Sequence, residues 1–74
     1  MSKTEAKTDR EKLQILLQHW IEHNQEHGQE FREWAEKAKI MGEVSVSDLV
    51  LDAAREMDKA NEPLLQALKN LEKK

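Results

Sequence analysis

Two long stretches of this chain carry side chains at alternating spacings of four and three residues, and this pattern constrains the fold most strongly. Such spacing lines the residues up on one stripe of an α-helix, along which a second helix can pack. The first stripe comprises Leu13, Leu17, Trp20, Asn24, His27, Phe31, Trp34, Ala38 and Met41. The second comprises Val46, Val50, Ala53, Met57, Ala60, Leu64, Ala67 and Leu71. The sequence therefore predicts two helices packed through these stripes.

Local signals give the expected limits of the first helix. Thr8 and Glu11 have the spacing of a capping box, so the helix is expected from about Thr8 to Met41. Gly42 supplies the left-handed residue that commonly ends a helix. Residues 1–7 have no apolar anchor and are expected to form a frayed tail, which leaves residues 8–74 as a single domain.

The second helix is expected from about Val46 to Leu71, with Ser45 or Ser47 as its N-cap. Pro63 lies inside it and removes one helical hydrogen bond, at a cost of about 3 kcal/mol. Because the apolar spacing stays in phase across Pro63, we expect one helix kinked at that residue. The alternative is a break just before Pro63, which would then open a third helix.

A short turn between two long helices makes them antiparallel neighbours, so the expected fold is an all-α antiparallel helical hairpin. Leu51, Leu65 and Leu68 lie off the predicted stripe and indicate a partner interface. The simplest partner is a second copy, which would give a dimeric four-helix bundle. The alternatives are a different protein partner, ordinary surface leucines, or a third helix folded over them.

Composition excludes several classes of function. The 12 Lys and Arg are interleaved among 15 Asp and Glu for a net charge of −3, so no basic face indicates nucleic acid binding. A chain of 74 residues is too short for a deep catalytic cleft, so no enzymatic activity is expected. No apolar run reaches the roughly 20 residues that span a bilayer, so we expect no membrane insertion and a cytoplasmic location.

The three histidines of the chain, His19, His23 and His27, follow one another at four-residue spacing. Side chains four apart share a helix face, whereas His19 and His27 are separated by about 12 Å along the axis. Glu26 and Glu30 lie within helical reach of the same face. Imidazole and carboxylate together suit Ni²⁺, Co²⁺ or Zn²⁺. The sequence therefore predicts a divalent metal site with His23 and His27 as ligands, Glu26 or Glu30 assisting and His19 peripheral.

The same region also permits a structural interpretation. Asn24, His27 and Asn61 are candidates for a polar core, in which His27 would bond to Asn61 or to Asn24 of a partner copy. The chain would then be a purely structural interaction or oligomerisation module without metal. A third possibility is pH sensing through imidazole protonation. Gly28 either admits a close contact from a second helix or is a tolerated surface glycine.

The segment His19-Trp20-Ile21-Glu22-His23-Asn24-Gln25-Glu26-His27, continuing through Phe31-Arg32-Glu33-Trp34-Ala35, carries a family resemblance. It is similar to a segment of small uncharacterised prokaryotic helical-hairpin proteins with an H-W-x-x-H-N-x-x-H pattern. The resemblance covers about Leu13 to Leu71. It implies a domain of unknown function loosely associated with nickel or cobalt transport, in which His19, His23 and His27 carry a metal-related accessory role.

Overall fold

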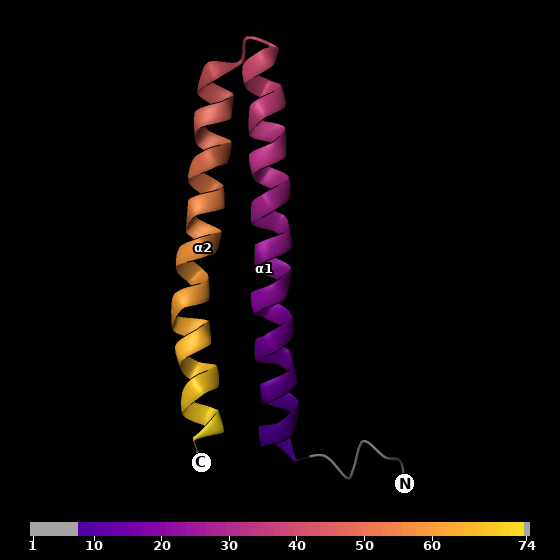
Figure 1. Ribbon diagram of the computed structural model, residues 1–74, viewed down its shortest axis with the longest axis vertical. Coiled ribbons are helices and arrows are strands. Elements are labelled where there is room, and N and C mark those ends of the chain that lie inside the picture. The colour runs from indigo at the N-terminus through magenta and orange to yellow at the C-terminus, as the bar shows by residue number, and fades with distance from the viewer. Residues whose placement is uncertain (1–7, 74) are drawn as a thin grey trace, which may run out of the picture.

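The computed structural model describes residues 8–73 as two long helices, α1 (Asp9–Ile40) and α2 (Val44–Glu72). They lie side by side and antiparallel along their whole length (Figure 1). No strand occurs among residues 8–73. The predicted all-α helical hairpin is therefore confirmed, whereas the tail expected over residues 1–7 lies outside the described residues.

The capping box at the start of α1 is present as predicted. The Thr8 hydroxyl accepts a hydrogen bond from the N–H of Glu11 at 3.1 Å, and the Glu11 carboxylate accepts one from the N–H of Thr8 at 3.0 Å. These two bonds satisfy donors that the first helical turn leaves free. The Arg10 guanidinium reaches across and donates to the carbonyl of Leu71 at 3.1 Å, which links the start of α1 to the end of α2.

Gly42 ends α1 in the predicted left-handed conformation, with φ of 90°. The N–H of Glu43 donates to the carbonyl of Ala38 at 2.8 Å, and the N–H of Gly42 donates to that of Lys39 at 3.0 Å. This pair of bonds is the Schellman arrangement, which satisfies carbonyls at a helix end and turns the chain sharply. The turn sends α2 back along α1.

The start of α2 corrects the sequence-based expectation. The helix begins at Val44, and its N-cap, Glu43, makes no side-chain capping bond. The N–H of Ser47 donates to the carbonyl of Glu43 at 3.0 Å, so Ser45 and Ser47 both lie inside the helix and the predicted serine cap is wrong. The Schellman turn leads the chain directly into the first turn of α2, so α2 starts without a serine cap. Ser47 is instead buried.

α2 continues without interruption through Pro63. The alternative of a break before this residue and a third helix is therefore wrong. A kink at Pro63 stays a prediction.

On α1, the residues that pack against α2 agree with the predicted stripe at every second position. At the positions between, the packing residue is the next one in the sequence. Leu17 is buried, and Asn24, Phe31 and Ala38 are half-buried, as the stripe requires. The predicted core positions Leu13, Trp20, Trp34 and Met41 are between 40% and 71% exposed, and that part of the expectation is wrong. The residues that follow Trp20 and Trp34, which are Ile21 and Ala35, face α2 instead, as does Gly28, which follows His27.

The same shift of one residue occurs on α2. Ala54 and Leu68 are buried and Asn61 is half-buried, whereas Ala60 and Ala67 are exposed. Small residues on the contact line allow the two helices to approach closely. At Gly28 an added Cβ would lie 3.8 Å from Cβ of Met57 and 3.9 Å from the carbonyl oxygen of Ala54. Gly28 thus admits the close helix contact, which was one of its two predicted roles.

The three leucines expected at a partner interface have different environments. Leu68 is only 8% exposed because it is part of the contact line with α1, so its side chain is not available to a partner. Leu51 is half-buried, and Leu65 is 44% exposed. Over residues 8–73, neither helix is long and apolar enough to cross a membrane.

Candidate functional site

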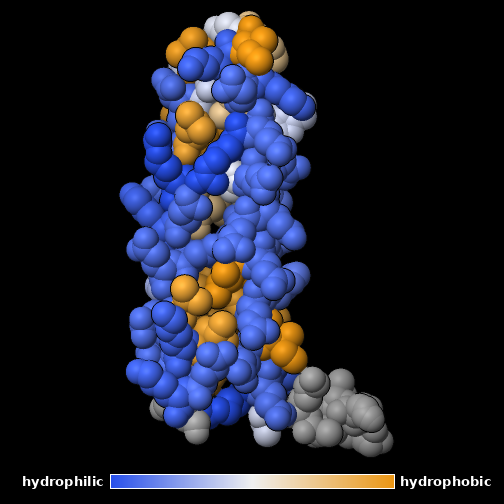
Figure 2. Space-filling model, viewed as in Figure 1, coloured by the Kyte–Doolittle hydropathy of each residue, from blue (hydrophilic) through white to orange (hydrophobic). Residues whose placement is uncertain are grey.

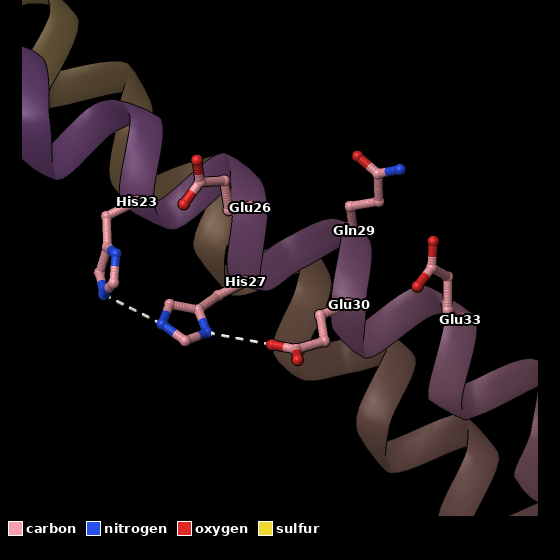
Figure 3. A pocket seen from close by; sticks show the side chains of 6 residues that line it. All are labelled: His23, Glu26, His27, Gln29, Glu30 and Glu33. Carbon is pink, nitrogen blue, oxygen red and sulfur yellow. Dashed lines mark hydrogen bonds and ion pairs between the residues drawn. The ribbon is translucent and has the colours of Figure 1, made fainter.

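The histidine segment lies in the middle of α1, where His23 and His27 point outward from the same side of the helix (Figure 3). Their Nε2 atoms are 3.0 Å apart, and the ring centroids are 4.3 Å apart with the ring planes nearly perpendicular at 89°. At this separation one ring donates its N–H and the other accepts. Two ring nitrogens therefore already meet at one point on the surface of the hairpin.

Glu30 contacts the opposite side of the His27 ring. One carboxylate oxygen of Glu30 lies 3.6 Å from Nδ1 of His27. A carboxylate beside Nδ1 favours a proton there, which leaves the Nε2 lone pair free to accept a bond or bind a cation. Glu30 is thus placed to orient His27 and does not approach the point between the two Nε2 atoms.

These groups line an open pocket of about 440 Å³. Its lining residues are His23, Glu26, His27, Gln29, Glu30 and Glu33. Three of the six are carboxylates, which makes the local potential favourable for a cation. Glu26 points away from the gap between the two imidazole rings (Figure 3), in contrast to its expected role as a ligand.

Sequence reasoning missed Gln29 and Glu33 as pocket residues. A signal for Glu33 was present, because Glu26, Glu30 and Glu33 are spaced by four and three and therefore share a helix face. Gln29 had no such signal, since it lies at the margin of that face.

His19 stacks on His23 with ring centroids 5.6 Å apart and the planes inclined by 18°. It does not line the pocket, and its peripheral role toward a metal stays a prediction. His27 in turn lies near Phe31, with centroids 6.1 Å apart. The rings form a row along α1, but only His23 and His27 bring two nitrogens together.

The separation of the two Nε2 atoms can be compared with metal geometry. Nitrogen ligands lie about 2.1 Å from a transition metal, so two ligands at a right angle are about 3.0 Å apart and two at a tetrahedral angle about 3.4 Å. The observed 3.0 Å fits adjacent positions of an octahedral or square-planar ion, and a small ring rotation would fit a tetrahedral one. Among residues 8–73, no group of three or more His, Asp or Glu side chains is arranged to hold an ion.

The expected polar core is present only in part. The Asn24 side chain donates to the Asn61 side chain at 2.9 Å, and Asn61 donates to the backbone carbonyl of Ile21 at 3.2 Å. His27 takes no part in this pair, and its side chain remains 40% exposed. The bond from His27 to Asn61, one of the two alternatives for a structural His27, is not formed, because His27 lies beside the helix contact and bonds to His23. A bond to Asn24 of a partner copy stays a prediction.

Comparison with known proteins gives one match. A family model described as Domain of unknown function (DUF8180) matches residues 13–71, which cover most of both helices. No curated protein and no solved structure matches the chain.

Proposed function

We propose that this chain, which belongs to the DUF8180 family of domains of unknown function, is a non-enzymatic helical binding module for a divalent transition metal. Ni²⁺, Co²⁺ or Zn²⁺ would bind through Nε2 of His23 and Nε2 of His27. The single observation that supports this function is the 3.0 Å separation of these two atoms on an exposed helix face. Because both rings already lie on one helix face, binding requires mainly that the hydrogen bond between them break and that the Nε2 proton of His23 move to its Nδ1.

The surrounding side chains have separate roles in this proposal. Glu30 orients the His27 ring through its contact with Nδ1. Glu26 and Glu33 supply negative charge close to the ion without direct bonds to it. Two protein ligands leave the other coordination positions to water or to groups from another molecule. The module would therefore present an ion with open positions, which suits transfer or presentation of a metal better than its permanent burial.

Other expectations from the sequence belong to the proposal and await a test. They are the dimeric four-helix bundle, the cytoplasmic location and the association with nickel or cobalt transport. The DUF8180 family has no assigned function, so the transport association rests on the resemblance of the histidine segment alone.

The proposal is tested by isothermal titration of the metal-free protein with Ni²⁺, Co²⁺ and Zn²⁺ at neutral pH. We expect saturable binding of one ion per chain, lost in the double variant His23→Ala, His27→Ala. The matched control is His19→Ala, which removes a histidine of the same row without touching the pocket. Binding weaker than about 1 mM, or binding that survives the double substitution, would reject the metal module.

A second candidate function is a purely structural interaction module without metal. It is favoured by the large apolar side chains that the hairpin leaves on its surface, among them Trp20, Trp34 and Leu65. Under this alternative the double histidine variant would change stability or assembly equally with and without added metal.

A further inference from the structure

A second line of uncharged side chains, apolar except at His27, runs along the hairpin at seven-residue spacing beside the contact between its two helices. We call it the outer stripe. Its α1 half consists of Leu13, Trp20, His27, Trp34 and Met41. Its α2 half consists of Val46, Ala53, Ala60 and Ala67. All nine residues are exposed or half-exposed in the hairpin.

The composition of the outer stripe is unlike that of solvent-facing surface. Charged residues make up 36% of the chain, so about three of the nine positions would be charged on an ordinary surface, yet none is. The opposite flank of α1 carries Gln25, Arg32 and Lys39 at the same spacing. There the side chain of Arg32 forms an ion pair with that of Asp58 of α2. The two flanks of the hairpin therefore differ, and only one lacks charge.

Both halves of the outer stripe lie on one face of the hairpin. In an antiparallel pair, positions one residue before the contact line on each helix fall on the same side of the pair. An open groove of about 390 Å³ confirms this, because Leu13 of α1 and Ala67 of α2 both line it. Figure 2 shows a mostly hydrophilic face of the hairpin, on which hydrophobic side chains form separate patches and no continuous strip. The nine residues of the outer stripe thus lie as an uncharged line on one face of the hairpin, with the carboxylates of the histidine pocket beside it at His27.

The two halves of the stripe are complementary in size. The α1 half carries a large side chain at every position, and the α2 half carries alanine at three of its four positions. Since Asn24 lies opposite Asn61, Trp34 is level with Leu51 and Trp20 with Leu65, so Ala53 and Ala67 lie two residues, about 3 Å, from these levels. Large and small residues therefore alternate across the face.

We propose that a second copy of this chain covers the outer stripe, with α1 of each copy lying over α2 of the other. Trp20 and Trp34 would then pack onto the partner's Ala67 and the partner's Ala53. A two-fold dimer needs a surface that complements itself, and this arrangement matches large with small residues in both halves of the interface. Every helix would be antiparallel to its two neighbours, as in an antiparallel four-helix bundle.

The available area suits this occupant. The 32 residues of α1 extend for about 48 Å, and two packed helices are about 20 Å wide, which gives a face of roughly 900 Å². Stable interfaces bury about 800 Å² on each partner. The hairpin alone buries few large side chains, because Leu17, Ala35, Ala54 and Leu68 are its buried apolar residues among those described. A second copy would supply the missing core.

The interface is tested by sedimentation equilibrium of the full chain at about 50 µM, without added metal. We expect a dimer for the natural sequence and a monomer for Ala60→Glu and for Ala67→Glu. The matched control is Leu65→Glu, which places the same charge on an exposed position of the opposite flank and should leave the dimer intact. Circular dichroism of each variant checks that the helices persist. A monomeric natural chain, or dissociation by Leu65→Glu but not by the alanine substitutions, would overturn the proposal.

The orientation of the two copies is tested by exchanging the large and the small residue of one proposed contact, Trp34 and Ala53. Trp34→Ala and Ala53→Trp should each weaken the dimer at least tenfold, and the double exchange should recover most of this loss. If α1 instead packs against α1 of the partner, the double variant will be no better than the worse single variant, and the proposed orientation is wrong. His27 belongs both to the outer stripe and to the proposed metal site, so the two proposals meet at this residue. Metal titration of Ala67→Glu separates them, since Ala67 does not line the histidine pocket.

Discussion

Asn24 donates a hydrogen bond from its side-chain amide to the side-chain oxygen of Asn61 at 2.9 Å, in the half-buried middle of the contact between α1 and α2. The amide of Asn61 continues the chain of bonds to the backbone carbonyl of Ile21 at 3.2 Å. Displacing one helix by a turn would break both bonds and leave polar groups unpaired between the helices. The pair therefore specifies which residues of the two helices lie opposite each other.

Asn61→Leu should destabilise the hairpin by about 1–3 kcal/mol, because the Asn24 amide loses its cross-helix partner. The double variant Asn24→Leu, Asn61→Leu should recover most of that loss, since it replaces both polar groups with apolar ones. Urea denaturation followed by circular dichroism gives both free energies. Equal losses in the single and the double variant would show that the hydrogen bond between the two side chains has no such role.

Gly28→Ala should raise the free energy of unfolding by about 0.5–1 kcal/mol. Alanine is a better helix former than glycine, and the tightest contact of the new Cβ, at 3.3 Å, is with the flexible end of Arg32. Gly28→Leu should destabilise by about 1–3 kcal/mol, because a large side chain would press on Met57 and Ala54. Thermal unfolding of the two variants checks the opposite signs. Stabilisation by leucine would mean that the helices do not approach closely at this position.

Thr8→Ala should cost about 1 kcal/mol, because it removes one half of the capping box at the start of α1. Ser45→Ala is the control and should leave stability unchanged or slightly higher, since Ser45 lies within α2 and caps nothing. Both free energies come from the same urea titrations. A loss in Ser45→Ala similar to that in Thr8→Ala would contradict the observed start of α2.

Pro63→Ala should stabilise the hairpin by about 1–3 kcal/mol. Alanine restores the helical hydrogen bond that proline cannot donate, and Pro63 is exposed, so no core packing is lost. Calorimetric unfolding measures the gain. A loss of stability would show that the proline contributes to the shape of α2, for example through the kink expected at this residue.

Bound metal should stabilise the folded chain, because the unfolded chain does not hold the two imidazoles together. At a free Ni²⁺ concentration about 100 times the dissociation constant, the gain is about 2.7 kcal/mol. The gain should vanish in His23→Ala and persist in His19→Ala. It should also diminish at acidic pH, because a protonated imidazole has no lone pair for the ion. Urea denaturation with and without Ni²⁺ measures each difference.

The sequence was sufficient to predict the hairpin, the cap at Thr8 and the turn at Gly42, because each depends on local spacing or on a single residue type. It was not sufficient to choose the contact line. Each helix carries two lines of mostly uncharged residues, one position apart in the sequence. The large side chains of Trp20 and Trp34 favoured the line that the structure leaves exposed, so the predicted core of α1 was wrong there. The structure uses the line with Gly28 and Ala35, since two helices without further layers pack closest over small residues.

The candidate site was predictable as a set of residues but not as an arrangement. Four-residue spacing indicated that His23 and His27 share a face, and the structure brings their Nε2 atoms together. Spacing alone could not show that Glu30 lies beside Nδ1 of His27 or that Glu26 points elsewhere, because both depend on side-chain rotamers. It also could not separate Asn24 and Asn61 from His27, since that required the correct contact line.

The most direct test of the metal site is nuclear magnetic resonance of the imidazole nitrogens in ¹⁵N-labelled protein during titration with Zn²⁺, which is diamagnetic. The proposed site predicts that the Nε2 signals of His23 and His27 shift together and saturate at one ion per chain, while the ring signals of His19 change little. If the His23 and His27 nitrogens do not shift, or if His19 shifts in their place, these two histidines do not form the metal site proposed for this hairpin.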